Sequence, residues 1–321
     1  MGRAIHAFRS RRFRIAVNTA IVSVGLTAAA LTAHHFLNGG WPLSNADPVL
    51  VAVAGILFVA AYGFKAWGWQ RLFPANQRPE AGTLAAAGGA AAVGGVALPG
   101  RFDEAIRIAV IRKLPGKTVG FGAIALTIIV VGLLDSAALT PMASIAAAAS
   151  ERASVQIGFA LVAAAGIAAA LVVFSLPRLA RARWVMRFKV GRWLRDHCAC
   201  HRTTSEAWFL ISISWSLRGL AVFMLLNALA VGASFPLALA FLCATAASAA
   251  LPIAPAGAAT QAGAGAAILI VSGVPKADAV AFALAAQGLI ILAGAAVFAA
   301  VGAWHLGVGL SRRGRKVAPA H

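Results

Sequence analysis

The sequence predicts an all-α integral membrane protein. Of its 321 residues, 61% are hydrophobic and 12% are charged, whereas a soluble domain usually carries about 25% charged residues. Several apolar stretches run about 17 to 25 residues almost without charge, which is the length that crosses a hydrocarbon core of about 30 Å. Two further apolar stretches are each interrupted by proline and glycine. The predicted architecture is therefore a set of spanning helices with two Pro-broken, re-entrant-type hairpins.

The charge and cysteine content narrow the classes of function. The formal net charge is +19, but the basic residues lie in short segments between apolar runs, which indicates membrane topology and contact with anionic lipid rather than nucleic acid binding. The three cysteines do not provide a disulfide framework. The cluster His197-Cys198-Ala199-Cys200-His201 is more crowded than the usual structural zinc spacing and favours a reduced cytoplasmic loop. We therefore expect neither a metal nor a cofactor.

The first half of the chain, 1–140, is predicted to form one repeat. Arginine and lysine cross the bilayer poorly during insertion and therefore mark the cytoplasmic side. The arginines between positions 9 and 14 precede an apolar run that has no clear small-x-small cleavage site, so we expect an uncleaved first helix. The predicted elements are helices 15–33, 48–64 and 119–140 and a hairpin over 84–116.

The hairpin is inferred from the position of the basic residues. Lys65, Arg71 and Arg78 are expected inside, and basic residues recur between positions 101 and 117. A single crossing by 84–99 would put that second basic segment outside. A hairpin that turns at Pro99 and Gly100 returns it to the cytoplasm, and these residues break helices well.

The second half, 154–306, repeats this order of elements from the opposite side of the membrane. Its predicted elements are helices 154–176, 206–231 and 279–304 and a hairpin over 235–273, which turns at Pro252, Pro255 and Gly257. The two halves therefore predict an inverted-topology repeat, an arrangement that places broken helices along a substrate path in secondary transporters. The alternative is a set of ordinary short helices with prolines at their ends. Both termini are expected in the cytoplasm of a bacterial plasma (inner) membrane.

A basic connector over 177–205 is predicted to join the two repeats. Trp184, Phe188 and Trp193 interleave with arginines there, which favours an amphipathic helix bound to anionic headgroups at 178–202. A merely solvated basic connector is the alternative. The topology puts Arg112, Lys117 and Arg187 inside and puts Asn45, Ser150 and Lys276 outside.

Two motifs resemble those of a known family. The stretches 97–107, with sequence ALPGRFDEAIR, and 251–257, with sequence LPIAPAG, are similar to the hairpin motifs of the flippase-like transmembrane family that includes the membrane domain of lysylphosphatidylglycerol synthases and hopanoid transport proteins. Glu104 and Arg107 match the family pattern. Asp103 replaces a glycine, Gly95 replaces a common asparagine, and Gln261 lies where the second motif usually leads to a glutamate.

The resemblance implies lipid translocation, with substrates that include aminoacylated, polyprenyl-linked and hopanoid-type lipids. No synthase domain is expected. Two alternatives are a non-catalytic membrane partner that recruits a lipid or cell-envelope synthase, and an integral-membrane lipid-modifying enzyme. The histidines lie in termini and loops and the acids are few, so we expect no catalytic residues and no enzyme activity.

The candidate substrate-binding residues are the charged groups at membrane depth. Arg101, Glu104 and Arg107 recur at three-residue spacing and would share one helix face, either binding a phosphate or extending to the headgroups. Arg218 lies in the middle of a spanning helix, where a charge is costly unless it faces a polar cavity or an acid. Asp135 and Glu104 are its candidate partners. The complete predicted set is Arg101, Asp103, Glu104, Arg107, Asp135, Arg218 and Gln261.

Overall fold

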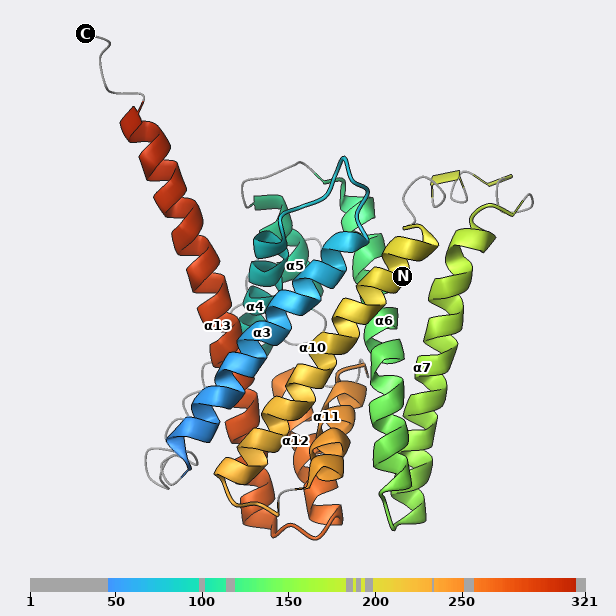
Figure 1. Ribbon diagram of the computed structural model, residues 1–321, viewed down its shortest axis with the longest axis vertical. Helices are drawn as coiled ribbons and strands as arrows, with labels where there is room; N and C mark the ends of the chain where they lie inside the picture. Colours follow the sequence, from blue (N-terminus) through green and yellow to red (C-terminus); the bar gives the residue numbers. More distant parts are fainter. Residues whose placement is uncertain are drawn as a thin grey trace, which may run out of the picture.

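The computed structural model describes residues 46–97, 102–113, 119–182, 187–188, 192–193, 199–232, 234–250 and 257–315. Within these ranges the chain forms nine α-helices and no strand (Figure 1). In chain order they are α3 (Pro48–Arg71), α4 (Ala81–Ala97), α5 (Phe102–Lys113), α6 (Phe121–Ala148), α7 (Ala153–Leu179), α10 (His201–Ala228), α11 (Phe235–Ala250), α12 (Gly257–Val271) and α13 (Lys276–Arg315).

The predicted all-α membrane fold is confirmed. Four complete helices, α3, α6, α7 and α10, and the Lys276–His305 part of α13 are long and apolar enough to cross a membrane. The predicted first span, 15–33, lies outside the described residues. The division into two inverted repeats stays a prediction.

Several predicted boundaries were wrong because helices continue past the apolar runs. α3 extends seven residues beyond the predicted end at 64 and so contains Lys65. α10 begins at His201 instead of 206, where an Arg202–Glu206 ion pair of 3.2 Å supports its first turn. It ends at Ala228 instead of 231, because Ala230 (φ 53°) and Gly232 (φ 50°) adopt left-handed backbone conformations.

The predicted connector is shorter than 177–205. α7 continues through Pro177 to Leu179, and the residues from His201 onward belong to α10. Of the segment between them, 183–186, 189–191 and 194–198 lie outside the described residues. The amphipathic helix predicted for the connector therefore stays a prediction.

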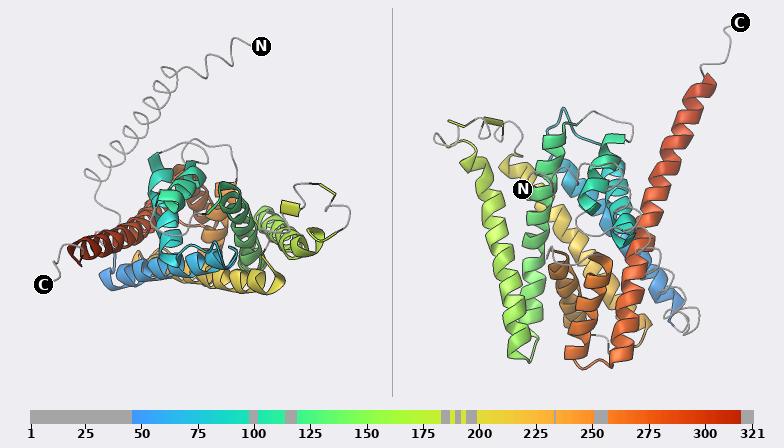
Figure 2. Two further views of the ribbon diagram at one scale, coloured as in Figure 1. Left: turned by 90° about the horizontal axis from the view of Figure 1, so that it is seen from above. Right: turned by 180° about the vertical axis from the view of Figure 1, so that it is seen from behind.

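Each predicted hairpin contains two short helices that pack against each other, α4 with α5 and α11 with α12. The four helices have 17, 12, 16 and 15 residues, and at 1.5 Å per residue none reaches the roughly 30 Å of a hydrocarbon core. The two pairs lie toward opposite ends of the bundle (Figures 1 and 2). The predicted turn residues Pro99, Gly100, Pro252 and Pro255 lie outside the described residues, and Gly257 is the first residue of α12.

The two ends of the bundle differ in charge. The end of α3, the end of α5 and the start of α10 lie together at one end (Figure 1), which we call the basic end. The described basic residues there include Arg71, Arg78, Arg112, Lys113, Arg178, Arg181 and Arg202. At the opposite end the backbone N–H of Asp47 donates to the carbonyl of Ala228 over 3.1 Å, which ties the start of α3 to the end of α10.

Small residues set the distance between neighbouring helices. At the crossing of α4 and α13, a Cβ on Gly89 would collide with the backbone of Gly294, and at the crossing of α3 and α10 a Cβ on Gly68 would lie 2.9 Å from the carbonyl oxygen of Ala207. Close approach of this kind gives transmembrane helices their packing energy, since lipid is as apolar as the side chains. It also brings the polar side chains of α3 and α10 within contact of each other.

Candidate functional site

Three spanning helices meet at the carboxylate of Asp135. This residue lies near the middle of α6, so it is remote from both ends of the bundle. Its Oδ2 is 2.7 Å from the Nζ of Lys65 on α3, and its Oδ1 accepts a hydrogen bond of 2.8 Å from the indole N–H of Trp215 on α10. About a fifth of each ion-pair side chain is exposed, 21% for Lys65 and 19% for Asp135. Both carboxylate oxygens are therefore engaged.

Arg218 lies one turn after Trp215 and is held by aromatic rings. Its guanidinium carbon is 5.0 Å from the ring centroid of Trp215 and 5.5 Å from that of Tyr62, which is buried on α3. Tyr62 donates a hydrogen bond of 3.5 Å to the carbonyl of Ile290 on α13. Cation–π contacts with two rings hold a charge at depth without neutralising it.

The first hairpin adds a third cation. Arg107 on α5 forms an ion pair of 3.2 Å with Asp103, one turn earlier on the same helix. The charges of Arg107 and Arg218 are both close enough to act electrostatically on Lys65. We define the polar cluster as these groups from four helices: Tyr62, Lys65, Asp103, Arg107, Asp135, Trp215 and Arg218.

The polar cluster has one more cation than it has carboxylates. Lys65 pairs with Asp135 and Arg107 pairs with Asp103, whereas Arg218 forms no ion pair with any residue that the structure describes. An uncompensated charge at membrane depth is expensive and usually faces water or a ligand. Because a guanidinium can donate two parallel hydrogen bonds to a phosphate or carboxylate, this arrangement is suited to an anion.

The predicted site residues have different outcomes. Asp135 and Arg218 both contact Trp215, and Arg107, which is paired with Asp103, acts electrostatically on Lys65. Glu104 is half-buried on α5 beside Asp103 in sequence, and Gln261 is half-buried on α12 in the second hairpin. Arg101 lies outside the described residues. A binding role for each of these residues stays a prediction.

Of the two candidate acidic partners of Arg218, Asp135 does not pair with it. Lys65 and the Trp215 indole occupy the two carboxylate oxygens of Asp135, which leaves Arg218 to the aromatic rings. From the sequence, Lys65 was expected on the cytoplasmic side after the second predicted span, whereas the structure places it within α3 and paired with Asp135. The signal for its burial was the sequence after it, because Ala66, Trp67 and Trp69 continue the apolar pattern of the helix.

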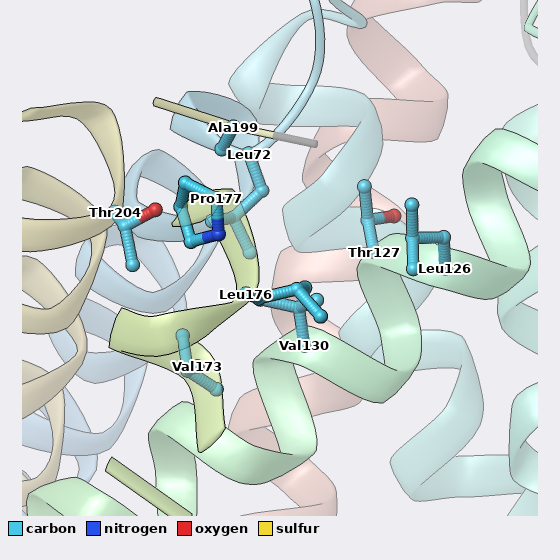
Figure 3. A pocket seen from close by; sticks show the side chains of 9 residues that line it. All are labelled: Leu72, Leu126, Thr127, Val130, Val173, Leu176, Pro177, Ala199 and Thr204. Atoms are coloured by element: carbon cyan, nitrogen blue, oxygen red, sulfur yellow. The ribbon is translucent and has the colours of Figure 1, made fainter. Parts of the chain in front are cut away.

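Figure 3 shows a small cavity near the basic end that is separate from the polar cluster. Its volume is about 20 Å³, enough for one water molecule. The buried hydroxyl side chains of Thr127 and Thr204 line it among apolar groups, and Thr127 also accepts a hydrogen bond of 3.1 Å from the Trp69 indole. A cavity of this size is a packing feature and cannot hold a lipid headgroup.

The histidine–cysteine cluster is described in part. His197 and Cys198 lie outside the described residues, so the expected absence of a metal stays a prediction. Cys200 is exposed at the start of α10, and its hydrogen bond of 3.5 Å with the Thr203 hydroxyl lowers the pKa of its thiol. Cys243, in contrast, is buried in α11.

Comparison with known protein families gives a match that covers most of the chain. The family model described as "Lysylphosphatidylglycerol synthase TM region" matches residues 13–301. No curated protein matches the sequence.

Proposed function

Because the chain belongs to the family of the lysylphosphatidylglycerol synthase transmembrane region, we propose that this multi-pass membrane protein moves a lipid between leaflets and that the polar cluster binds the lipid headgroup in passage. The substrate class is a lipid with an anionic, aminoacylated, polyprenyl-linked or hopanoid-type structure. The proposal is transport without a chemical step. We further propose that the protein resides in a bacterial inner membrane and that its basic end faces the cytoplasm.

The observation that carries the proposal is the uncompensated charge of Arg218. Arg218 lies 17 residues from the start and 10 residues from the end of α10, which at 1.5 Å per residue is about 25 Å and 15 Å. Phosphate is the anion that every phospholipid carries into the membrane, and arginine matches its geometry. The short arm α5 carries Arg107, whose charge acts on Lys65, and it supports a path for a headgroup along the first hairpin.

The aromatic surroundings of Arg218 support a transient site. Tyr62 and Trp215 stabilise the guanidinium when no anion is bound, and no carboxylate that the structure describes pairs with it. A headgroup therefore gains hydrogen bonds without first breaking an ion pair. Binding strong enough to desolvate the headgroup and weak enough to release it is what passage requires.

Translocation in proteoliposomes tests the proposal. Arg218→Gln keeps much of the side-chain length and removes the charge, so transport of a headgroup-labelled anionic lipid should fall about tenfold or more, the size of one or two charge-assisted hydrogen bonds. Arg152→Gln is the matched control, because Arg152 is exposed at the opposite end of the bundle. Both variants should insert and purify at wild-type yield.

Two results would contradict the proposal. Wild-type transport by Arg218→Gln would show that the headgroup path avoids the polar cluster. No transport by the wild-type protein, together with co-purification of a lipid or cell-envelope synthase, would favour the alternative of a recruiting partner.

A further inference from the structure

A second concave surface lies on the outside of the bundle, near the basic end. It is a groove of about 600 Å³ between α7 and α10, with α6 as its floor, and this volume is within the range of ligand sites. None of the residues that line it belongs to the polar cluster. They are Ala137, Thr140, Pro141, Ile167, Ala170, Leu171, Phe174, Ser175, Arg178, His201 and Trp208.

The groove has the dimensions of one membrane leaflet. From Ile167 to Arg178, α7 rises about 16 Å at 1.5 Å per residue, which is close to half of a hydrocarbon core of about 30 Å. Its deeper part is apolar, and Ile167 and Leu171 are 53% and 68% exposed. The upper part reaches the basic end, where α7 finishes and α10 begins.

Aromatic side chains form the wall between α7 and α10. The Phe174 ring stacks on that of His201, with centroids 6.1 Å apart and planes 19° apart. On its other side Phe174 meets Trp208 edge to face, with centroids 6.5 Å apart. These contacts hold the upper groove in a defined shape, with flat apolar surfaces directly below the polar rim.

The rim of the groove carries an available cation. Arg178 is exposed and forms no ion pair with a residue that the structure describes. Glu206 on α10 binds Arg71 at 3.6 Å and Arg202 at 3.2 Å, so this carboxylate is already engaged by two other arginines. Arg178 and the imidazole of His201 therefore face the headgroup region as donors without an acidic partner.

We infer that this groove is a binding site for an anionic phospholipid of the leaflet at the basic end, with its phosphate on Arg178 and His201 and an acyl chain along Phe174, Leu171 and Ile167. The cationic rim complements the phosphate, and the apolar part has the length of a chain within one leaflet. A free anion would leave the apolar wall unoccupied. The site is independent of the proposed transport, because it requires only that the protein span the membrane.

Lipid retention measured by native mass spectrometry tests the site. The full-length protein is equilibrated with mixed phosphatidylglycerol and phosphatidylcholine micelles, and the bound lipids are counted. The wild-type protein should retain phosphatidylglycerol preferentially, and Arg178→Gln should lower that preference about tenfold, the size of one charge-assisted hydrogen bond. Arg181→Gln is the matched control, because Arg181 is exposed at the same end and does not line the groove.

A second variant tests the apolar part. Ala170 is half-buried in the groove, so Ala170→Trp should fill it and remove the retained lipid. A phosphatidylglycerol with a photoreactive group in its acyl chain should label peptides that contain 167–178 in the wild-type protein, which gives a readout that does not depend on the folding of a variant. Arg218→Gln should keep the groove lipid, so loss of transport and loss of this site are distinguishable.

The inference is overturned by any of three results. Arg178→Gln and Arg181→Gln could lower the preference equally, which would indicate a diffuse basic surface. The photoreactive lipid could label elsewhere, which would show ordinary surrounding lipid. A wild-type dimer that Ala170→Trp converts to a monomer would show that a second copy of the chain occupies the groove.

Discussion

The first hairpin reaches the polar cluster with charged side chains, whereas the second fills the space beside α6, α10 and α13 with apolar ones. α5 carries Asp103, Glu104 and Arg107, and α11 and α12 contain no charged residue. In the second hairpin, Phe241 packs edge to face on Phe282 of α13, with centroids 5.1 Å apart. Two hairpins of similar shape thus differ in chemistry: one carries charged side chains, of which Arg107 acts on Lys65, and the other packs apolar side chains within the bundle.

The first test asks whether the two hairpins open toward opposite sides of the membrane. In a background without the native cysteines, Lys276→Cys should react with an impermeant thiol reagent in intact cells, and Arg112→Cys should react only after permeabilisation. The effect is all or none, because the bilayer excludes the reagent. Arg112 ends the first hairpin at the basic end, and Lys276 follows the second at the opposite end.

A separate variant that keeps Cys200 alone, with Cys198 and Cys243 replaced, provides a control for this labelling. Cys200 lies at the basic end and its thiol pKa is lowered, so it should react readily with a permeant reagent and resist an impermeant one. Labelling of Arg112→Cys from outside would show that α4 and α5 do not return to the cytoplasmic side.

The next largest predicted effect is a loss of stability on breaking the Lys65–Asp135 ion pair. Asp135→Ala should lower the free energy of unfolding by about 2 to 3 kcal/mol, because it leaves Lys65 without its partner; partial exposure reduces the effect below that for a fully buried pair. Lys65→Met in the same chain should restore most of the loss. Thermal unfolding of the purified protein in detergent measures both.

Glu206→Ala is the matched control for Asp135→Ala, since its pairs with Arg71 and Arg202 are exposed. It should lower the free energy of unfolding by less than about 1 kcal/mol. Equal losses of free energy of unfolding for the two substitutions would mean that the Lys65–Asp135 pair contributes no more to stability than an exposed ion pair.

Glycine packing gives a smaller effect that also separates the hairpins. Gly89→Ala in α4 forces a methyl group against the backbone of Gly294, which cannot move aside without shifting α13, so we expect a loss of about 1 to 3 kcal/mol. Gly265→Ala in α12 meets the tip of the Phe241 ring, and a ring can turn, so its loss should be smaller.

Gly263 offers the control for these substitutions, because a Cβ there has no neighbour within 4 Å. Gly263→Ala should leave the unfolding temperature unchanged or raise it, in keeping with the helix preference of alanine. We expect the helix crossing at Gly89 in the first hairpin to be more rigid than the one at Gly265 in the second. A larger loss of stability for Gly265→Ala than for Gly89→Ala would contradict this expectation.

The smallest predicted effects concern transport. Arg107→Gln should slow it a few-fold, since Arg107 contributes charge beside the site and is already paired with Asp103. Gln261→Leu in the second hairpin should change it by less than about twofold, because one neutral hydrogen bond contributes little. The same liposome measurement serves both, and a stronger effect of Gln261→Leu would move the headgroup path to the second hairpin.

The sequence by itself determined the fold class and the approximate positions of the spans that the structure describes. Span length follows from bilayer thickness, so it is a local property of the chain. The hairpin turns at proline and glycine stay a prediction, because most of their residues lie outside the described ranges. Charge asymmetry then predicted that the basic segments gather at one end of the bundle, which is where the described ones lie. Helix ends were less predictable, because ion pairs such as Arg202–Glu206 extend helices beyond their apolar runs.

Only the tertiary structure decided which charges meet. Lys65, Asp135 and Trp215 are 70 and 80 residues apart along the chain, and no local pattern specifies which side chain occupies each carboxylate oxygen. Asp135 and Arg218 were both predicted as site residues, with Asp135 as one candidate partner of Arg218, and the structure shows that Lys65 takes that position instead. The groove on α6, α7 and α10 likewise arises only from helix packing, since Phe174 and Arg178 of α7 meet His201 and Trp208 of α10, which the sequence separates by the basic connector.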